Sequence, residues 1–244
     1  MKFTIRQHGF IALQGLLLFG VNYWLVYEAE VYLASGLIAV AFSTLVFLNS
    51  IFGAIFLKTP INKKILMAAL LGLSGTVLIF SNEFLGLTFS QETIIGTIFT
   101  MLSVALASLG NITSARNSAN QIPVLQANAY GMMYGGILMA LLALILGRTF
   151  SFDPSATYII SLMYLAVFGS IIAFGTYLTL ISRVGADKAA YALVIIPVIA
   201  ICISLAFEDY QMTPYAAVGI VLILIGNVLA IRQKGKPSKS VKTT

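Results

Sequence analysis

The C-terminal part of the chain, residues 185–231, restricts the fold more than any other stretch. It contains two apolar runs, residues 189–207 and 214–231, joined by a short polar loop that carries Glu208 and Asp209. A helix rises about 1.5 Å per residue, so each run can cross the roughly 30 Å hydrocarbon core of a bilayer. Charged residues lie only at the ends of the runs, whereas a soluble domain would place them along an exposed face. The pair is therefore predicted to span a membrane.

Apolar spans of this kind recur along the whole chain. We expect eight of them, at residues 9–27, 33–57, 65–81, 93–115, 126–147, 157–182, 189–207 and 214–231. The first shows no small-residue cleavage site, so we interpret it as a retained helix rather than a signal peptide. The predicted fold is an all-α integral membrane protein, a polytopic bundle of eight transmembrane helices.

The distribution of charge predicts the orientation of these helices. With the N-terminus in the cytoplasm, thirteen of the fourteen Lys and Arg residues fall on the cytoplasmic side, and Arg148 is the exception. Seven of the eight Asp and Glu residues fall outside, and Asp187 is the exception. An excess of basic residues in cytoplasmic loops is the known bias of membrane proteins. Both termini are therefore predicted to be cytoplasmic, with a basic, disordered tail at 233–244 resting on anionic headgroups.

Composition excludes several classes of function. Charged residues make up 9% of the chain and hydrophobic residues 59%, against roughly 25% charged in soluble proteins. The net charge of +6 forms no basic face with interleaved aromatic residues, so nucleic-acid binding is not expected. With Cys202 and His8 as the single residues of their types, we expect no metal site and no cofactor. The spans contain no paired catalytic groups, so the chain is not predicted to be an enzyme.

An internal repeat relates two parts of the chain at a spacing of 151 residues. Six residues recur without a gap, namely Ala39, Ala41, Phe56, Leu73, Gly75 and Leu78 as Ala190, Ala192, Phe207, Leu224, Gly226 and Leu229. In the predicted orientation, the span 33–57 runs inward and its counterpart 189–207 runs outward. The two units are therefore predicted to be inverted, an arrangement that supports alternating access around a midplane site.

Uncharged polar residues take the place of charges inside the spans. A charge at mid-bilayer costs about 2.5–3.5 kcal/mol, so its absence argues against an ion pump or a buried proton relay. Each Asn suits either a cavity wall or an interhelical hydrogen bond worth about 0.6 kcal/mol. Pro197 frees a backbone carbonyl, which suits a cavity wall or a kink alone. Small residues at 131 and 135, and at 68, 72 and 75, are interpreted as close helix contacts.

Two long stretches resemble the EamA-type family of the drug/metabolite transporter superfamily. They are residues 32–80, YLASGLIAVAFSTLVFLNSIFGAIFLKTPINKKILMAALLGLSGTVLIF, and residues 164–227, YLAVFGSIIAFGTYLTLISRVGADKAAYALVIIPVIAICISLAFEDYQMTPYAAVGIVLILIGN. Members of that family have ten helices in two inverted five-helix repeats, and characterised ones mostly export metabolites, amino acids or toxic compounds. The resemblance implies a transporter of the bacterial inner membrane with the same classes of substrate.

The resemblance also implies an organisation and a set of site residues. It predicts a partial first repeat of three helices at 1–83 and a second repeat of five at 84–232, without the family's first two helices. The Pro that the family has in the second span is absent, with Leu45 and Val46 at that place, whereas Pro197 is retained in the seventh span. Family cavities lie between helices equivalent to the first, second, fourth, sixth and seventh spans. The predicted cavity residues are Asn22, Tyr23, Ser43, Asn49, Asn111, Tyr177, Tyr191 and Pro197.

Two functional hypotheses follow. The first is a secondary carrier that exports a small organic metabolite, amino acid or drug-like compound by alternating access. The alternative is a non-transporting product or subunit that needs a partner, because a missing helix pair would leave the cavity open on one side. The expected partners are the lipid bilayer, a small-molecule substrate, and a homodimer or a second membrane protein.

Overall fold

A computed structural model describes residues 3–81, 85, 90–148, 152–196, 198–199 and 213–231. Five helical runs are long and apolar enough to cross a membrane, at Ile5–Glu30, Ser35–Leu57, Gln91–Ala119, Val124–Ile145 and Ala156–Val184. They coincide with the first, second, fourth, fifth and sixth predicted spans. The third and eighth predicted spans are the shorter α5 (Lys63–Ile79) and α14 (Pro214–Ile231). The seventh lies partly outside the described residues.

The remaining helices divide these runs into labelled segments. The first run consists of α1 (Ile5–Gly15), the π-helical η1 (Leu16–Gly20) and α2 (Val21–Glu30), and the second of α3 (Ser35–Phe42) and α4 (Leu45–Leu57). Next come α7 (Gln91–Ala119) and α8 (Val124–Ile145), then α9 (Ala156–Tyr164), the π-helical η2 (Leu165–Ile172) and α10 (Ala173–Val184). The short helix α11 (Ala186–Ala189) leads into the seventh span, and the short helix α12 (Tyr191–Val194) lies in its first part.

Hydroxyl side chains fix the starts of three of the runs. The side chain of Thr4 accepts a hydrogen bond from Gln7 N, and the Gln7 side chain bonds back to Thr4 N, which forms a capping box at α1. Ser90 and Ser155 cap α7 and α9 in the same position, each accepting from the backbone N–H three residues on. Such caps satisfy the N–H groups that have no partner inside the helix. The starts of these runs are therefore set locally.

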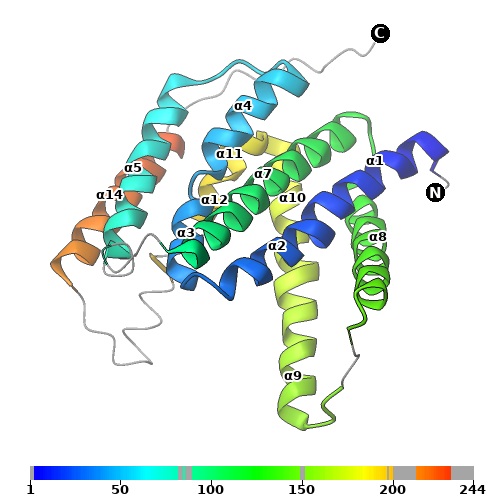
Figure 1. Cartoon of the computed structure of the whole chain (residues 1–244). Coiled ribbons are helices and arrows are strands. Elements are labelled where there is room, and N and C mark those ends of the chain that lie inside the picture. Colours follow the sequence, from blue (N-terminus) through cyan, green and yellow to red (C-terminus); the bar gives the residue numbers. More distant parts are fainter. Residues whose placement is uncertain are drawn as a thin grey trace.

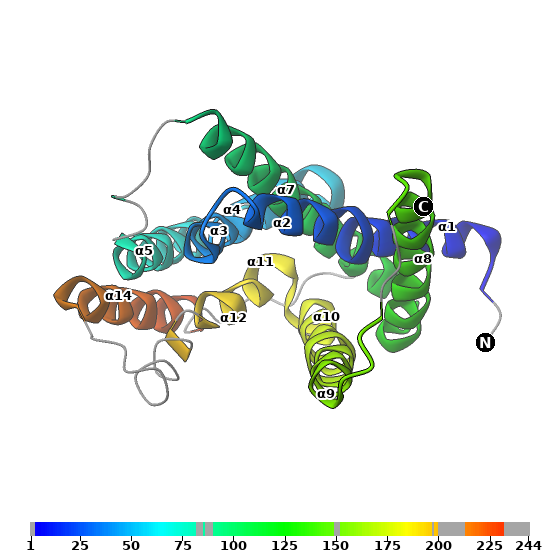
Figure 2. The same ribbon diagram turned by 60° about the horizontal axis from the view of Figure 1, so that its bottom comes forward.

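The helices form two layers that contact one another along their length. Figure 2 shows α1, α2, α7, α4 and α5 in one layer and α10, α11, α12 and α14 in the other. Helix α14 lies beside α5 (Figure 1), and α8 packs against α1 and α10 at the opposite end of the layers. Helix α9 projects beyond the other helices.

Small residues allow α5 and α14 to approach one another closely. A methyl group added to Gly75 would lie 2.5 Å from Gly219 O, and one added to Gly226 would lie 2.9 Å from Ala68 O. These two contacts are related by the 151-residue repeat. Gly226 is the repeat counterpart of Gly75, and Ala68 is the repeat counterpart of Gly219. In the same way, the contact of Gly75 with Ile223 corresponds to the contact of Gly226 with Gly72, and the structure contains both. Reciprocal contacts of this kind arise when two related units pack about a two-fold axis.

A second glycine contact joins α1 to α8. The backbones of Gly15 and Gly131 meet with no room for a methyl group on Gly15, and a methyl group on Gly135 would lie 3.0 Å from Phe19. The interpretation of Gly131, Gly135 and the 68–75 seam as packing residues is confirmed.

The parts of the chain related by the 151-residue shift also share their π-helical segments and helix breaks. Residues 16–20 of η1, shifted by 151, fall within η2, and the break between α3 and α4 at Ser43–Thr44 corresponds to the end of α12 at Val194 and Ile195. The break in the first half forms without a proline. There, Ser43 Oγ donates to Ala39 O at 3.2 Å and Thr44 Oγ1 donates to Ala41 O at 2.6 Å. Hydroxyls that bond the preceding turn are known to bend helices.

Candidate functional site

Four side chains from three helices form a polar cluster inside the bundle. The cluster consists of Asn49 on α4, Ser108 and Asn111 on α7, and Tyr177 on α10. Ser108 Oγ donates to Asn49 Oδ1 at 2.8 Å, and Asn111 Nδ2 donates to the Tyr177 hydroxyl at 3.2 Å. Asn49 Nδ2 donates to the carbonyl of Ala186 on α11 at 2.9 Å. The cluster therefore connects α4 with α7, α10 and α11, which lie later in the chain.

The chain positions of these residues explain why they meet. Ser108 and Asn111 are three residues apart and lie on one face of α7. Asn49, Asn111 and Tyr177 come eight, eight and seven residues before the ends of their helices, or about 12 Å from those ends at 1.5 Å per residue. Three helices that run in the same direction thus bring their polar residues to one level.

The turn between α10 and α11 completes the cluster. Gly185 has a φ of 93°, a value that favours glycine, and its N–H donates to Ile181 O at 2.9 Å where α10 ends. The chain then reverses into α11, which places the Ala186 carbonyl against Asn49.

The amide of Asn111 is not fully satisfied. Asn49 and Asn111 are each 1% exposed, and Ser108 is completely buried. Asn111 Oδ1 is buried and has no hydrogen-bond partner in the structure. A buried polar atom without a partner is costly, and this carbonyl therefore retains the capacity to accept a hydrogen bond.

Aromatic side chains adjoin the cluster. The rings of Phe19 on η1 and Phe174 on α10 meet edge to face with centroids 4.9 Å apart, and the Tyr23 ring lies 6.3 Å from Phe174. Tyr23, Tyr177 and Phe174 all pack on the apolar residues around Leu178 and Ile112. An uncharged amide and hydroxyl surface thus borders an aromatic one.

The other predicted cavity residues make separate helix–helix contacts. Asn22 Nδ2 donates to Ser103 O at 3.3 Å, and Ser43 Oγ donates to Thr76 Oγ1 at 3.2 Å. The Tyr191 hydroxyl donates to Ile65 O. For Asn22, the bond to Ser103 is the interhelical hydrogen bond predicted from the sequence as the alternative to a cavity wall. Pro197 lies outside the described residues, so its role stays a prediction, as does substrate contact by the cluster itself.

Several polar residues of the bundle were not predicted as site residues. Ser108 is one of them, although its spacing of three from Asn111 is a usable signal. Gln14 is fully buried, and Asn117 Nδ2 donates to its Oε1 at 3.0 Å. The Tyr134 hydroxyl lies 2.8 Å from His8 Nδ1.

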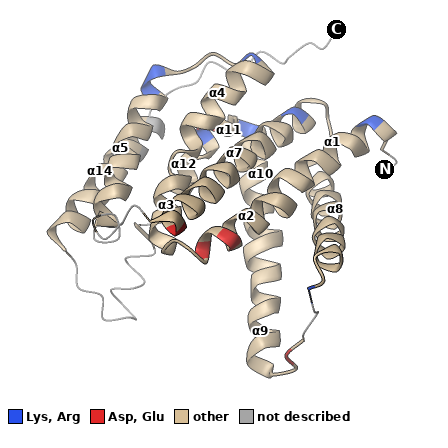
Figure 3. Ribbon diagram, viewed as in Figure 1, with Lys and Arg blue, Asp and Glu red and all other residues tan. Residues whose placement is uncertain are grey.

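Charges lie at the ends of the helices rather than inside the bundle. In Figure 3 the blue Lys and Arg segments gather at the end of the bundle formed by α4, α5, α7, α11 and the start of α1, and red segments lie on α2 and near α3. Burial raises the pKa of the Asp187 carboxyl above its usual range, although the Lys188 charge and nearby N–H groups oppose this effect. Across the described ranges no group of three or more His, Cys, Asp or Glu side chains is placed to hold a metal ion.

A family model places this architecture among known proteins. The model of the EamA-like transporter family matches residues 94–232, more than half of the chain. The chain belongs to the EamA-like transporter family. It is accordingly a multi-pass membrane protein of a transporter family, as the two stretches discussed above predicted.

Similar EamA-like proteins come from several bacteria. An uncharacterized transporter of Clostridium kluyveri is 24% identical over 251 residues, which cover all of this chain and 79% of the relative. The uncharacterized inner membrane transporter YedA of Escherichia coli K12 is 27% identical over 219 residues, or 88% of this chain and 68% of YedA. The uncharacterized transporter YoaV of Bacillus subtilis 168 is 23% identical, with 75% of this chain and 63% of YoaV covered.

A solved crystal structure shares the fold. It superposes with a TM-score of 0.73 over 94% of this chain and 76% of the other chain, at 18% identity. At this identity the likeness concerns the fold alone. The predicted limits of the two repeats, 1–83 and 84–232, stay a prediction.

Proposed function

We propose that this EamA-like protein is a secondary transporter that exports a small organic compound, such as a metabolite, an amino acid or a drug-like molecule, from the bacterial cytoplasm. The observation that carries the proposal is the polar cluster, which joins the two halves of the bundle through uncharged groups and leaves Asn111 Oδ1 without a partner. Aromatic rings beside one unpaired amide oxygen suit a compound with an apolar body and a hydrogen-bond donor.

We propose further that the basic end of the bundle faces the cytoplasm of the inner membrane, with both termini on that side. The described Lys and Arg residues other than Arg148 belong to segments that the alternation of spans assigns to the cytoplasm, as the positive-inside bias requires. The cluster, about 12 Å from this end, is then the contact that closes the inner side of the pathway.

The strength of the cluster suits a reversible gate. Interhelical hydrogen bonds in membranes contribute about 0.6 kcal/mol on average. Opening the inner side would break the bonds from Asn49 to Ala186 and Ser108 and from Asn111 to Tyr177, about 2 kcal/mol in all. A difference of that size corresponds to roughly a thirtyfold change in population, which a substrate that binds the open state more tightly can overcome.

Transport by the purified chain tests the proposal. The full chain is reconstituted in proteoliposomes, and protein-dependent movement of radiolabelled amino acids and organic cations is measured. We expect Asn111→Leu and Tyr177→Phe each to lower the transport rate by about tenfold. Asn111→Leu removes the free amide carbonyl, and Tyr177→Phe removes the hydroxyl that holds the Asn111 amide in place. Thr97→Val and Thr176→Val are the matched controls, because both hydroxyls are exposed and bond only their own helices.

The outcomes separate the function from the site. If the wild-type chain moves none of these compounds, the transport proposal is contradicted. If it transports but all four variants match it, the cluster is not the site. A loss in the control variants equal to that in Asn111→Leu would point to a fault in folding instead, which a thermal unfolding curve of each variant detects.

A second candidate function is a subunit that works only with a partner membrane protein. One observation favours it: none of the residues of α9 and η2 is buried. Replacing Cys202 by Ser and introducing Leu162→Cys on α9 tests for a second copy at this surface. Disulfide-linked dimers in native membranes would support the candidate, and uniform labelling of the introduced thiol by a lipid-soluble maleimide would contradict it.

A further inference from the structure

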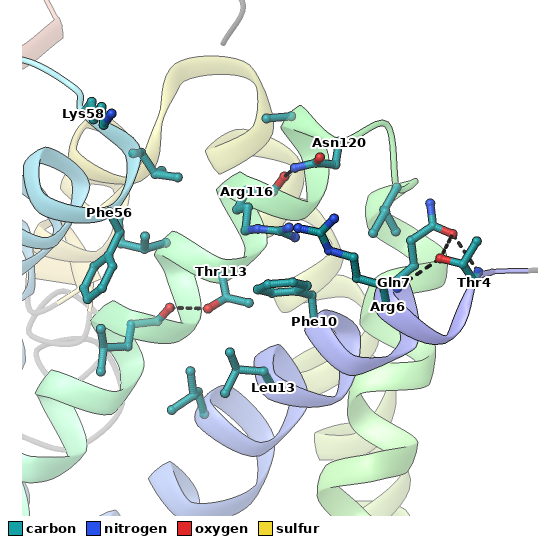
Figure 4. Close-up of a pocket in the computed structure, with 16 residues that line it drawn as sticks. Thr4, Arg6, Gln7, Phe10, Leu13, Phe56, Lys58, Thr113, Arg116 and Asn120 are labelled. Carbon is teal, nitrogen blue, oxygen red and sulfur yellow. Dashed lines mark hydrogen bonds between the residues drawn. The ribbon is translucent and has the colours of Figure 1, made fainter. Parts of the chain in front are cut away.

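A groove separate from the polar cluster lies between α1, α4 and α7. It has a volume of about 1110 Å³ and is bordered by α1 and the start of η1, the end of α4 and the second half of α7. Figure 4 shows Phe10, Leu13 and Thr113 along its floor and Arg6, Lys58 and Arg116 around its rim. The groove therefore has an apolar floor and a basic rim.

The rim carries positive charge without a compensating carboxylate. Among the described residues that line the groove there is no Asp or Glu. Arg6 and Arg116 point toward one another (Figure 4), close enough for their charges to repel. The Arg116 guanidinium lies 3.2 Å from the centroid of the Phe10 ring, which holds it over the groove. An anion bound between the two guanidinium groups would remove the repulsion and accept hydrogen bonds from both.

The floor extends the groove along the helices, away from the basic end. Along α1 and η1 it passes from Arg6 through Leu13 to Leu17, and on α7 from Arg116 through Ile112 to Leu109. Eleven residues from Arg6 to Leu17 correspond to about 16 Å of helix. A surface of this length and apolarity accommodates a hydrocarbon chain, whereas a free phosphate or a small polar metabolite would leave it uncovered.

We propose that this groove binds an anionic phospholipid. Its phosphate lies between Arg6 and Arg116, Lys58 adds positive charge on the opposite side of the rim, and one acyl chain lies along the apolar floor. The placement fits the bilayer, because the basic rim is at the end of membrane-crossing helices, where headgroups lie, and the floor is at the depth of the acyl chains. Basic pockets between helices are a known form of lipid recognition.

Native mass spectrometry of the detergent-purified full chain tests the site. The protein is mixed with phosphatidylglycerol or phosphatidylcholine, and retained lipid is counted. We expect the wild type to retain phosphatidylglycerol in preference to phosphatidylcholine. Each basic residue near an anionic surface contributes roughly a fivefold change in affinity, so Arg6→Gln with Lys58→Gln should weaken phosphatidylglycerol binding by roughly 25-fold. These two side chains are exposed, so the double variant is expected to fold normally.

Matched variants make the result specific to the groove. Arg148→Gln with Lys64→Gln removes the same charge from residues that do not line the groove and should retain phosphatidylglycerol like the wild type. Leu17→Ser, on the floor, should weaken the long-chain lipid more than dihexanoyl phosphatidylglycerol. Equal retention of the two lipids by the wild type, or an equal loss in both double variants, would overturn the proposal. Competition by inorganic phosphate as effective as that by the lipid would show a free-anion site and overturn it as well.

Discussion

The helical runs Ile5–Glu30 and Ala156–Val184 have the same local structure, but the first is packed along its length and the second only in its last segment, α10. Each contains an α-helix, a π-helical segment and a second α-helix, and the two π segments coincide after a shift of 151. In the most apolar 18-residue stretch of the first run 39% of the residues are buried, and in that of the second none is. Both runs are apolar because both cross the membrane, so apolarity does not reveal which of them faces protein.

The first run is covered by α7 and α8. Leu18 packs where Gly110 of α7 leaves room, and Gly15 meets Gly131 of α8. Among the described residues no helix pair covers α9 and η2 of the second run in this way, since no residue of these two segments is buried. The comparison shows that the π segment forms with or without a covering helix pair, whereas burial depends on such a pair.

Glycine substitutions should separate the two runs most strongly. Gly15→Leu places a side chain where the Gly131 backbone lies, whereas Gly169→Leu on η2 meets only Leu165 Cδ2, at 3.8 Å from the added Cβ. We expect Gly15→Leu to lower the free energy of unfolding by about 3 kcal/mol, or roughly 6–12 °C in Tm, and Gly169→Leu to have little effect. Thermal unfolding in detergent measures both. A loss in Gly169→Leu as large as that in Gly15→Leu would mean that a protein surface covers η2.

Polar contacts should show a smaller contrast between the same runs. Asn22→Leu removes the buried bonds between α2 and Ser103, and we expect a loss of about 1 kcal/mol in the free energy of unfolding. Thr176→Val on α10 removes a hydroxyl that is exposed and bonds only the preceding turn, so its effect should stay within about 0.5 kcal/mol. Equal losses in a denaturation series would show that Thr176 has a partner in the membrane.

The sequence was sufficient for the helices because length and apolarity decide them locally. Residues 214–231 were predicted as a span and form α14 with the same limits. The absence of a proline near Val46 gave no reason to expect the break at Ser43–Thr44, since two hydroxyls replace it by bonding the preceding turn. Helix breaks with this cause have no single-residue signature.

The candidate site was harder to predict, because it depends on which helix faces meet. Asn22 and Asn49 are alike in sequence, as each is an amide within an apolar run, and no local rule distinguishes them. The structure places Asn49 against Ser108 and the Ala186 carbonyl, and Asn22 against Ser103. Their partners lie 59 to 137 residues away in the chain. Only the packing of the two halves decides that Asn49 joins a cluster with Asn111 and Tyr177.

The ends of the two runs should show the smallest contrast, and it depends on pH. The first run ends at the exposed Glu30, whereas the second is followed by the half-buried Asp187. Burial raises the pKa of the Asp187 carboxyl, and Lys188 lowers it by a smaller amount. A carboxyl with a raised pKa binds more protons in the folded than in the unfolded protein, so stability falls as pH rises from the unfolded value of about 4 through the folded pKa. Asp187→Asn should therefore raise the Tm slightly at pH 7.5, and the gain should shrink as the pH approaches 4. Glu30→Gln is the control and should leave the Tm unchanged at both pH values. A loss of stability in Asp187→Asn at pH 7.5 would mean that the charge of Asp187 is stabilised more by Lys188 and the α11 N-terminus than it is penalised by burial.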